Sequence, residues 1–159
     1  MFNPKYRILL TSKYFPEDRV VCLGRQLISI IDSIKNYLAP HMWYGADVEV
    51  VGKNSTTHHL NDIQLRRIGT DLQFADYCHE VDQFIWGVFL CVDSNFSSQS
   101  ILGIELETED KSFRPVNING ALMEIRAFDT TYFGLYFEDL ELTKIISKLY
   151  DVEIEKDEA

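Results

Sequence analysis

Hydrophobic side chains recur at steps of three and four between residues 20 and 38. The positions are Val20, Leu23, Leu27, Ile30, Ile31, Ile34 and Leu38. This period is that of one face of a helix, so the pattern predicts an amphipathic helix over 20–38. Asp18 stands where a helix cap is expected. Pro40 predicts an end near Leu38, because proline disfavours helical geometry in the residue before it.

Two other stretches have the pattern of strands. Over residues 42–51, Val48 and Val50 alternate with acidic side chains, as in a strand that is buried on one face. Residues 84–92, FIWGVFLCV, are apolar with almost no alternation. Such a run is typical of a central strand that is buried on both faces.

The region between these strands favours helix. Residues 61–69, NDIQLRRIG, have Asn61 as an expected cap and Gly69 as an expected terminator. A second helical segment is expected to begin at Thr70. The two segments form either two separate helices or one bent helix.

The last sixty residues predict strands, short turns and a final helix. The expected strands cover 101–107, 115–118, 121–128 and 132–137. Asn119-Gly120 lies between two of these runs and is a strong hairpin signal, because both residues tolerate positive φ. Asp129 suits a turn, where its carboxylate accepts a hydrogen bond from the backbone two residues on.

A C-terminal helix is expected to open at Glu138-Asp139. Its apolar face is formed by Leu142, Ile145, Ile146 and Leu149. Acidic residues in a first turn favour the helix dipole, so Asp139 and Glu141 have a structural role there. The acidic tail over about 152–159 is expected to be either a short edge strand or disordered.

The order of these elements predicts the fold class. One helix precedes a strand, one or two helices follow it, and hairpin-connected strands lead to the last helix. We therefore expect a single α+β domain over 1–159, with a mainly antiparallel sheet of about five to six strands. The domain would carry an N-terminal helix, one or two middle helices and a C-terminal helix.

Cysteines and apolar runs bear on the compartment. Cys22, Cys78 and Cys91 are widely spaced and odd in number, which fits neither a disulfide framework nor a zinc site. We expect them to be reduced and buried. The sequence has neither a signal peptide nor an apolar run of the ~18 residues that a membrane span requires, so a soluble cytoplasmic protein is expected.

Charge is concentrated in the C-terminal part of the chain. Residues 1–100 hold 9 Lys and Arg against 11 Asp and Glu, and residues 101–159 hold 6 against 14, so the net charges are −2 and −8. Nucleic-acid binding rests on basic residues that neutralise phosphates, so DNA and RNA are not expected partners. An acidic surface instead attracts a basic protein, although it also serves solubility alone.

Residues that could carry out chemistry are few. His58, His59, His79 and Glu80 include types that bind zinc, but the second histidine of an H-E-x-x-H helix is missing. No phosphate-binding or dinucleotide-binding glycine motif occurs, so no cofactor is expected. The enzymatic alternative is a small hydrolase or metal-dependent enzyme with a site around His79, Glu80 and Asp82.

The ending MEIRAFDTTYFGLYFEDLELTKII, in a small acidic chain, resembles immunity proteins of bacterial polymorphic-toxin systems. The resemblance covers the C-terminal third best. It implies a cytoplasmic protein that binds and neutralises a toxin domain, often a basic nuclease, without catalysis.

The leading hypothesis is therefore a non-enzymatic acidic protein that sequesters or neutralises a basic protein partner. Acidic residues after position 100 and the tyrosines among them are the expected contacts, because such side chains are common in protein-binding surfaces. The set is Glu105, Glu107, Glu124, Asp129, Tyr132, Tyr136, Glu138, Asp139 and Glu141. No membrane partner is expected, and the oligomeric state does not follow from the sequence.

Overall fold

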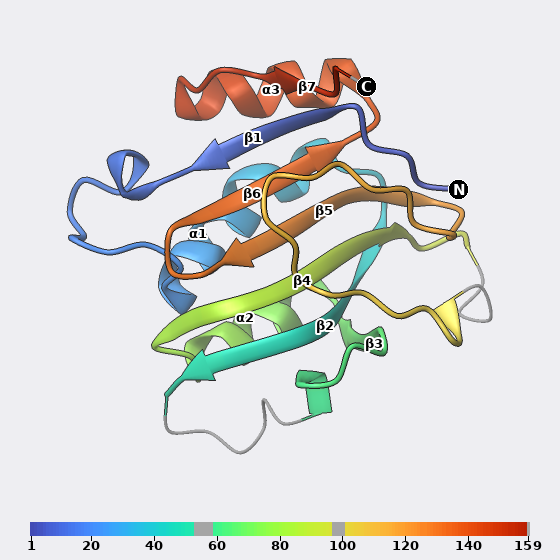
Figure 1. The fold of residues 1–159 in the computed structure, drawn as a ribbon, viewed down its shortest axis with the longest axis horizontal. Helices are drawn as coiled ribbons and strands as arrows, with labels where there is room; N and C mark the ends of the chain where they lie inside the picture. Colours follow the sequence, from blue (N-terminus) through green and yellow to red (C-terminus); the bar gives the residue numbers. More distant parts are fainter. Residues whose placement is uncertain (53–58, 97–100, 159) are drawn as a thin grey trace.

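The computed structural model describes residues 1–52, 59–96 and 101–158, and these residues contain one seven-stranded sheet (Figure 1). The strands are β1 (Tyr6–Leu10), β2 (His41–Val51), β3 (Arg66–Gly69), β4 (Gln83–Asp93), β5 (Ala121–Phe128), β6 (Tyr132–Phe137) and β7 (Glu155–Lys156). Their order across the sheet is β3-β2-β4-β5-β6-β1-β7, and all neighbouring pairs are antiparallel. The α+β class with an antiparallel sheet is thus confirmed.

Three α-helices pack on one face of this sheet. They are α1 (Gly24–Ile34), α2 (Asp71–His79) and α3 (Leu140–Tyr150). In Figure 1, α1 and α2 lie behind the sheet and α3 runs beside β1. Leu27 of α1, Phe74 of α2 and Ile146 of α3 are buried in one apolar core with strand residues such as Phe89 and Leu135. No helix in the described ranges is long and apolar enough to cross a membrane.

The opposite face of the sheet is covered by irregular chain. Residues 101–120 cross in front of β4, β5 and β6 in Figure 1. Leu106 and Val116 from this segment pack with Val88 and Leu90 in a second, smaller core. Because both faces of the sheet are covered, a central strand such as β4 is apolar along most of its length.

Several predicted elements are confirmed. Strands β2, β4, β5 and β6 agree closely with the segments expected at 42–51, 84–92, 121–128 and 132–137. Thr70 caps α2 by accepting a hydrogen bond from the N–H of Gln73. Asp139 caps α3, and its Oδ1 accepts from the N–H groups of Glu141 and Leu142 at 2.8 and 3.2 Å. The three cysteines are free and buried, and burial raises the pKa of the Cys22 thiol to about 12.

The helix expected over 61–69 is wrong. Residues 66–69 form β3 on the edge of the sheet, beside β2. Before it, the N–H of Leu65 donates to the carbonyl of Ile104 at 2.8 Å, and the N–H of Leu106 donates to the carbonyl of Ile63 at 2.7 Å. Distant backbone partners therefore replace the local hydrogen bonds that a helix would make.

The strands expected over 101–107 and 115–118 are also wrong. Each segment makes one isolated bridge, Gln64 with Glu105 and Phe2 with Val116, and no hairpin forms across Asn119-Gly120. These segments are held instead by apolar side chains that pack into the second core. Packing on a sheet face can select the same alternating residues that a strand would use.

The N-terminal region differs from expectation in two respects. The helix α1 begins at Gly24 rather than near Val20, and Asp18 bonds the side chains of Arg25 and Gln26 instead of capping it. The strand β1 precedes the helix and was not expected. With β1, β3 and β7 the sheet has seven strands, which is more than the predicted five to six. The acidic tail contains β7, which pairs with Tyr6 and Arg7 of β1. Of the two alternatives for the tail, the short edge strand is therefore the one that forms.

Candidate functional site

Three of the expected partner-binding residues lie inside the protein. Glu124 and Tyr136 have no exposed surface, and Tyr132 is 3% exposed. A partner cannot reach these side chains while the protein is folded. Glu124, Tyr132 and Tyr136 are therefore withdrawn from the candidate surface.

Their interactions explain this burial. The carboxylate of Glu124 accepts from Nε of Arg126 at 3.0 Å and from Nη2 of Arg114 at 2.5 Å. The Arg126 guanidinium lies 3.8 Å from the centre of the Tyr136 ring. The hydroxyl of Tyr132 donates to Asp110 at 2.8 Å, and burial together with this bond raises the pKa of Tyr132. These side chains hold residues 107–114 against the sheet.

A second group of expected residues lies at the start of α3. Glu138 accepts a hydrogen bond from the N–H of Asn3 at 2.6 Å, and Glu141 is 3.4 Å from the ammonium of Lys144. Asp139 is the helix cap described above. Each of these carboxylates has a partner within the protein. Glu105 is exposed on the irregular segment and lies away from this helix end.

Glu107 and Asp129 lie together at the opposite end of β6 from Glu138. They line one cavity of about 430 Å³, called the acidic cavity below. Its lining residues are Asp47, Trp86, Glu107, Thr108, Phe128 and Asp129. The cavity therefore joins β2, β4, the turn between β5 and β6, and the irregular segment.

The aromatic wall of the acidic cavity comes from the register of the sheet. Trp86 on β4 stands opposite Phe128 on β5, and Phe128 stands opposite Tyr132 on β6. The rings of Phe128 and Tyr132 are stacked, with centroids 5.4 Å apart. Trp86 is 38% exposed, so its indole remains accessible from solvent.

Two carboxylates reach the acidic cavity through left-handed backbone positions. Asp47 has φ of 52° at an irregularity of β2 between Ala46 and Glu49. Asp129 has φ of 46° in the turn that the N–H of Thr131 closes on the carbonyl of Phe128. Aspartate tolerates this conformation better than most residues do. Both positions thus turn a carboxylate out of the regular alternation of a strand.

The third wall of the acidic cavity is the segment that contains Glu107 and Thr108. The N–H of Thr108 donates to Oδ2 of Asp47 at 2.7 Å. Arg114 donates to the carbonyl oxygen of Glu107 and also binds the buried Glu124. The buried ion pair therefore fixes the backbone that presents the Glu107 carboxylate.

The described residues do not balance the charges of the acidic cavity. No lysine or arginine is among the described residues that line it. Within the described ranges, the carboxylates of Glu107 and Asp129 make no hydrogen bond or ion pair, and Asp47 uses only Oδ2. Carboxylates beside an exposed indole are suited to bind a cationic group.

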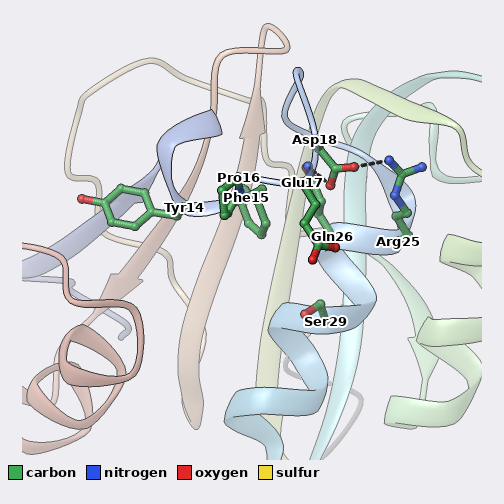
Figure 2. Close-up of a pocket in the computed structure, with 8 residues that line it drawn as sticks. All are labelled: Tyr14, Phe15, Pro16, Glu17, Asp18, Arg25, Gln26 and Ser29. Atoms are coloured by element: carbon green, nitrogen blue, oxygen red, sulfur yellow. Dashed lines mark hydrogen bonds and ion pairs between the residues drawn. The ribbon is translucent and has the colours of Figure 1, made fainter.

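A second hollow, called the α1 cleft below, lies between residues 14–18 and α1 and measures about 380 Å³ (Figure 2). Asp18 and Arg25 are paired with each other here, whereas Glu17 makes no hydrogen bond or ion pair among the described residues. Asp18 accepts from the guanidinium of Arg25 and, at 2.9 Å, from Nε2 of Gln26, and these bonds lower the pKa of Asp18. The buried Gln26 also binds the backbone of Val20 and Leu23. This network joins the preceding segment to the start of α1.

The residues of the enzymatic alternative lie at the end of α2. His79 is the last helical residue, Glu80 follows it, and Asp82 precedes β4, and all three are exposed. The described ranges contain no group of three His, Cys, Asp or Glu side chains placed to hold a metal ion. His58 lies outside the described residues.

Comparison of the chain with protein-family models, curated proteins and solved structures finds no match. Sequence reasoning missed Asp47, Trp86 and Phe128. Asp47 belonged to the polar side of an expected strand, and Trp86 belonged to an apolar run. Only the strand register brings an aromatic residue from each of β4 and β5 beside the acidic residues.

Proposed function

We propose that the chain is a non-enzymatic acidic protein that sequesters or neutralises a basic protein, in the manner of an immunity protein, and that it docks this partner at the acidic cavity. One observation carries the proposal. Asp47, Glu107 and Asp129 line the cavity beside the accessible Trp86, and no lysine or arginine in the described part of the chain lines it. Of the nine partner-binding residues expected from the sequence, the proposed site keeps Glu107 and Asp129, and it adds Asp47.

The physical basis is charge complementarity. Like charges that lie close together repel, and a cation from a partner offsets this repulsion. The net charge of −10 also accelerates the encounter with a basic surface, most strongly at low salt. Exposed tryptophan is among the residues that contribute most to binding when a partner covers them.

The proposal includes a cytoplasmic location. Three free, buried cysteines suit a reducing compartment, where disulfides are rare. A toxin-neutralising role of the kind implied by the resemblance to immunity proteins would act in this compartment.

A capture experiment with three tagged baits tests the proposal. The baits are the wild type, the variant D47N/E107Q/D129N (cavity-neutralised) and the variant D76N/E153Q/E158Q (surface-neutralised). Asparagine tolerates the left-handed positions of Asp47 and Asp129, so the first variant keeps the backbone. Each variant removes three negative charges, so the two have the same net charge.

Extract of the native cell is passed over each bait and eluted with rising salt, and the eluted proteins are identified by mass spectrometry. We expect the wild type and the surface-neutralised bait to retain the same basic protein and the cavity-neutralised bait to lose it. Equal retention by all three baits, or no basic protein on the wild type, contradicts the proposal. Circular dichroism of each bait provides the folding control.

A further inference from the structure

We propose that the acidic cavity accepts one arginine side chain of the partner, with the guanidinium against Trp86 and Phe128 and its N–H groups directed at the carboxylates of Asp47, Glu107 and Asp129. This inference rests on the proposed function and names the group that the site recognises. It follows from arrangements that the protein already uses for its own arginines on the same face of the sheet.

The first of these arrangements surrounds Arg126. Its guanidinium lies 3.8 Å from the centre of the Tyr136 ring. Its Nε donates to Glu124 at 3.0 Å, and its Nη1 donates to the carbonyl of Ser112 at 2.7 Å. One arginine thus combines an aromatic face, a carboxylate and a backbone acceptor.

The second arrangement surrounds Arg7. Its guanidinium lies 4.8 Å from the centre of the Phe113 ring, and its Nε donates to Glu155 at 2.5 Å. It also donates to the carbonyl of Lys111. The same three components recur: an aromatic ring, a carboxylate, and a carbonyl from the irregular segment that covers the sheet.

The same components meet in the acidic cavity, where no cation of the described residues lies beside the carboxylates. Trp86 and Phe128 supply the rings, and Glu107 and Asp129 supply carboxylates on different walls. The hydroxyl oxygen of Thr108 is buried and has no hydrogen-bond partner in the described ranges, so an acceptor is also available. At about 430 Å³ the cavity is large enough for a side chain and too small for a folded segment.

Arginine suits this arrangement better than lysine does. A guanidinium is planar, stacks on aromatic rings and directs five N–H groups outward in one plane, so it can address carboxylates on several walls at once. An ammonium is compact, strongly hydrated and less able to stack. The cavity therefore recognises the shape of the cation as well as its charge.

Nuclear magnetic resonance titration tests the inference directly. The protein contains two tryptophans and therefore two indole N–H signals. Trp43 is buried and donates to Asp71 at 2.8 Å, so its signal is an internal reference for the signal of Trp86. The probes are the capped tripeptides Gly-Arg-Gly, Gly-Lys-Gly and Gly-citrulline-Gly, added at low salt.

We expect the arginine tripeptide to shift the Trp86 indole signal and the amide signals of Glu107 and Thr108, with a Kd on the order of 10 mM or tighter, as befits a ligand of this size. The lysine tripeptide should bind at least about threefold more weakly, because it loses the stacking contribution. The uncharged citrulline tripeptide and the cavity-neutralised variant should give no shift.

Two results overturn the inference. If lysine and arginine shift Trp86 equally, the cavity is a general cation site, and the proposed function stands without the arginine preference. If no probe moves Trp86, the cavity does not take a basic side chain, whereas capture that depends on the cavity carboxylates would still support the proposed function. Binding of arginine without capture of a basic protein supports the inference and contradicts the function.

Discussion

The α1 cleft and the acidic cavity are similar in size, about 380 and 430 Å³, and both contain carboxylates. In the α1 cleft, Asp18 is bonded to Arg25 and Gln26 within the protein. In the acidic cavity, Glu107 and Asp129 have no such partner among the described residues. The α1 cleft contains Arg25 as a cation of its own, whereas no described lysine or arginine lines the acidic cavity, so the proposed function assigns the carboxylates of the acidic cavity to a cation of a partner.

The largest expected effect concerns Glu124. Like Asp18 in the α1 cleft it is paired with arginine, but it is fully buried. E124Q leaves the buried Arg126 without a carboxylate and Arg114 with Glu109 alone, so we expect the free energy of unfolding to fall by about 3 kcal/mol or more. Urea denaturation measures the change. The matched variant at an exposed position, E105Q, should stay within about 0.5 kcal/mol of the wild type. Equal effects of the two variants would show that Glu124 does not stabilise the fold.

A smaller effect is expected at the α1 cleft itself. Q26A removes the bonds from Gln26 to Leu23, Val20 and Asp18, so we expect a loss of about 2 kcal/mol in the free energy of unfolding, because the buried N–H of Leu23 loses its partner. Titration with the arginine tripeptide should be unchanged. Loss of tripeptide binding in a folded Q26A protein would mean that the two hollows are coupled.

The cavity-neutralised variant should lose tripeptide binding and keep its stability, the reverse of Q26A. Its three substitutions remove unbalanced like charges, so we expect the free energy of unfolding to be unchanged or higher by up to about 1 kcal/mol. Urea denaturation beside the wild type provides the test. A clear decrease would assign these carboxylates to the stability of the fold.

The smallest effect is the pH dependence of the α1 cleft. The bonds from Arg25 and Gln26 lower the pKa of Asp18, so its contribution to stability is present above the unfolded pKa of about 3.9 and is lost as the pH falls through the lower folded value. The difference in Tm between wild type and D18N should therefore be constant from neutral pH to about pH 5 and shrink below about pH 4. A difference that persists at pH 2 would contradict this assignment.

The sequence predicted the elements whose pattern is local. Strands β5 and β6 and the helix capped by Asp139 follow from alternation, turn residues and caps. The strand β3 and the irregular segment 101–120 did not follow, because their backbone and side-chain partners lie far away in the chain. Local patterns do not specify such contacts.

Only part of the candidate site was predicted, because the rest depends on contacts between distant segments. Glu107 and Asp129 were expected from their charge, and both line the acidic cavity. Glu124 has the same charge, but it is buried beside Arg126, and this depends on the register of β5 with its neighbours. Asp47 and Trp86 join the site only through the irregularity of β2 and the pairing of β4 with β5.

The most direct test of the account is the affinity of the captured basic protein for wild type, cavity-neutralised and surface-neutralised chains, measured by titration calorimetry at equal salt. We expect the cavity-neutralised chain to bind at least about tenfold more weakly than the wild type, a loss of about 1.4 kcal/mol, and the surface-neutralised chain to stay within about twofold. Equal weakening of the two variants would show that only net charge matters and that the acidic cavity is not the docking site.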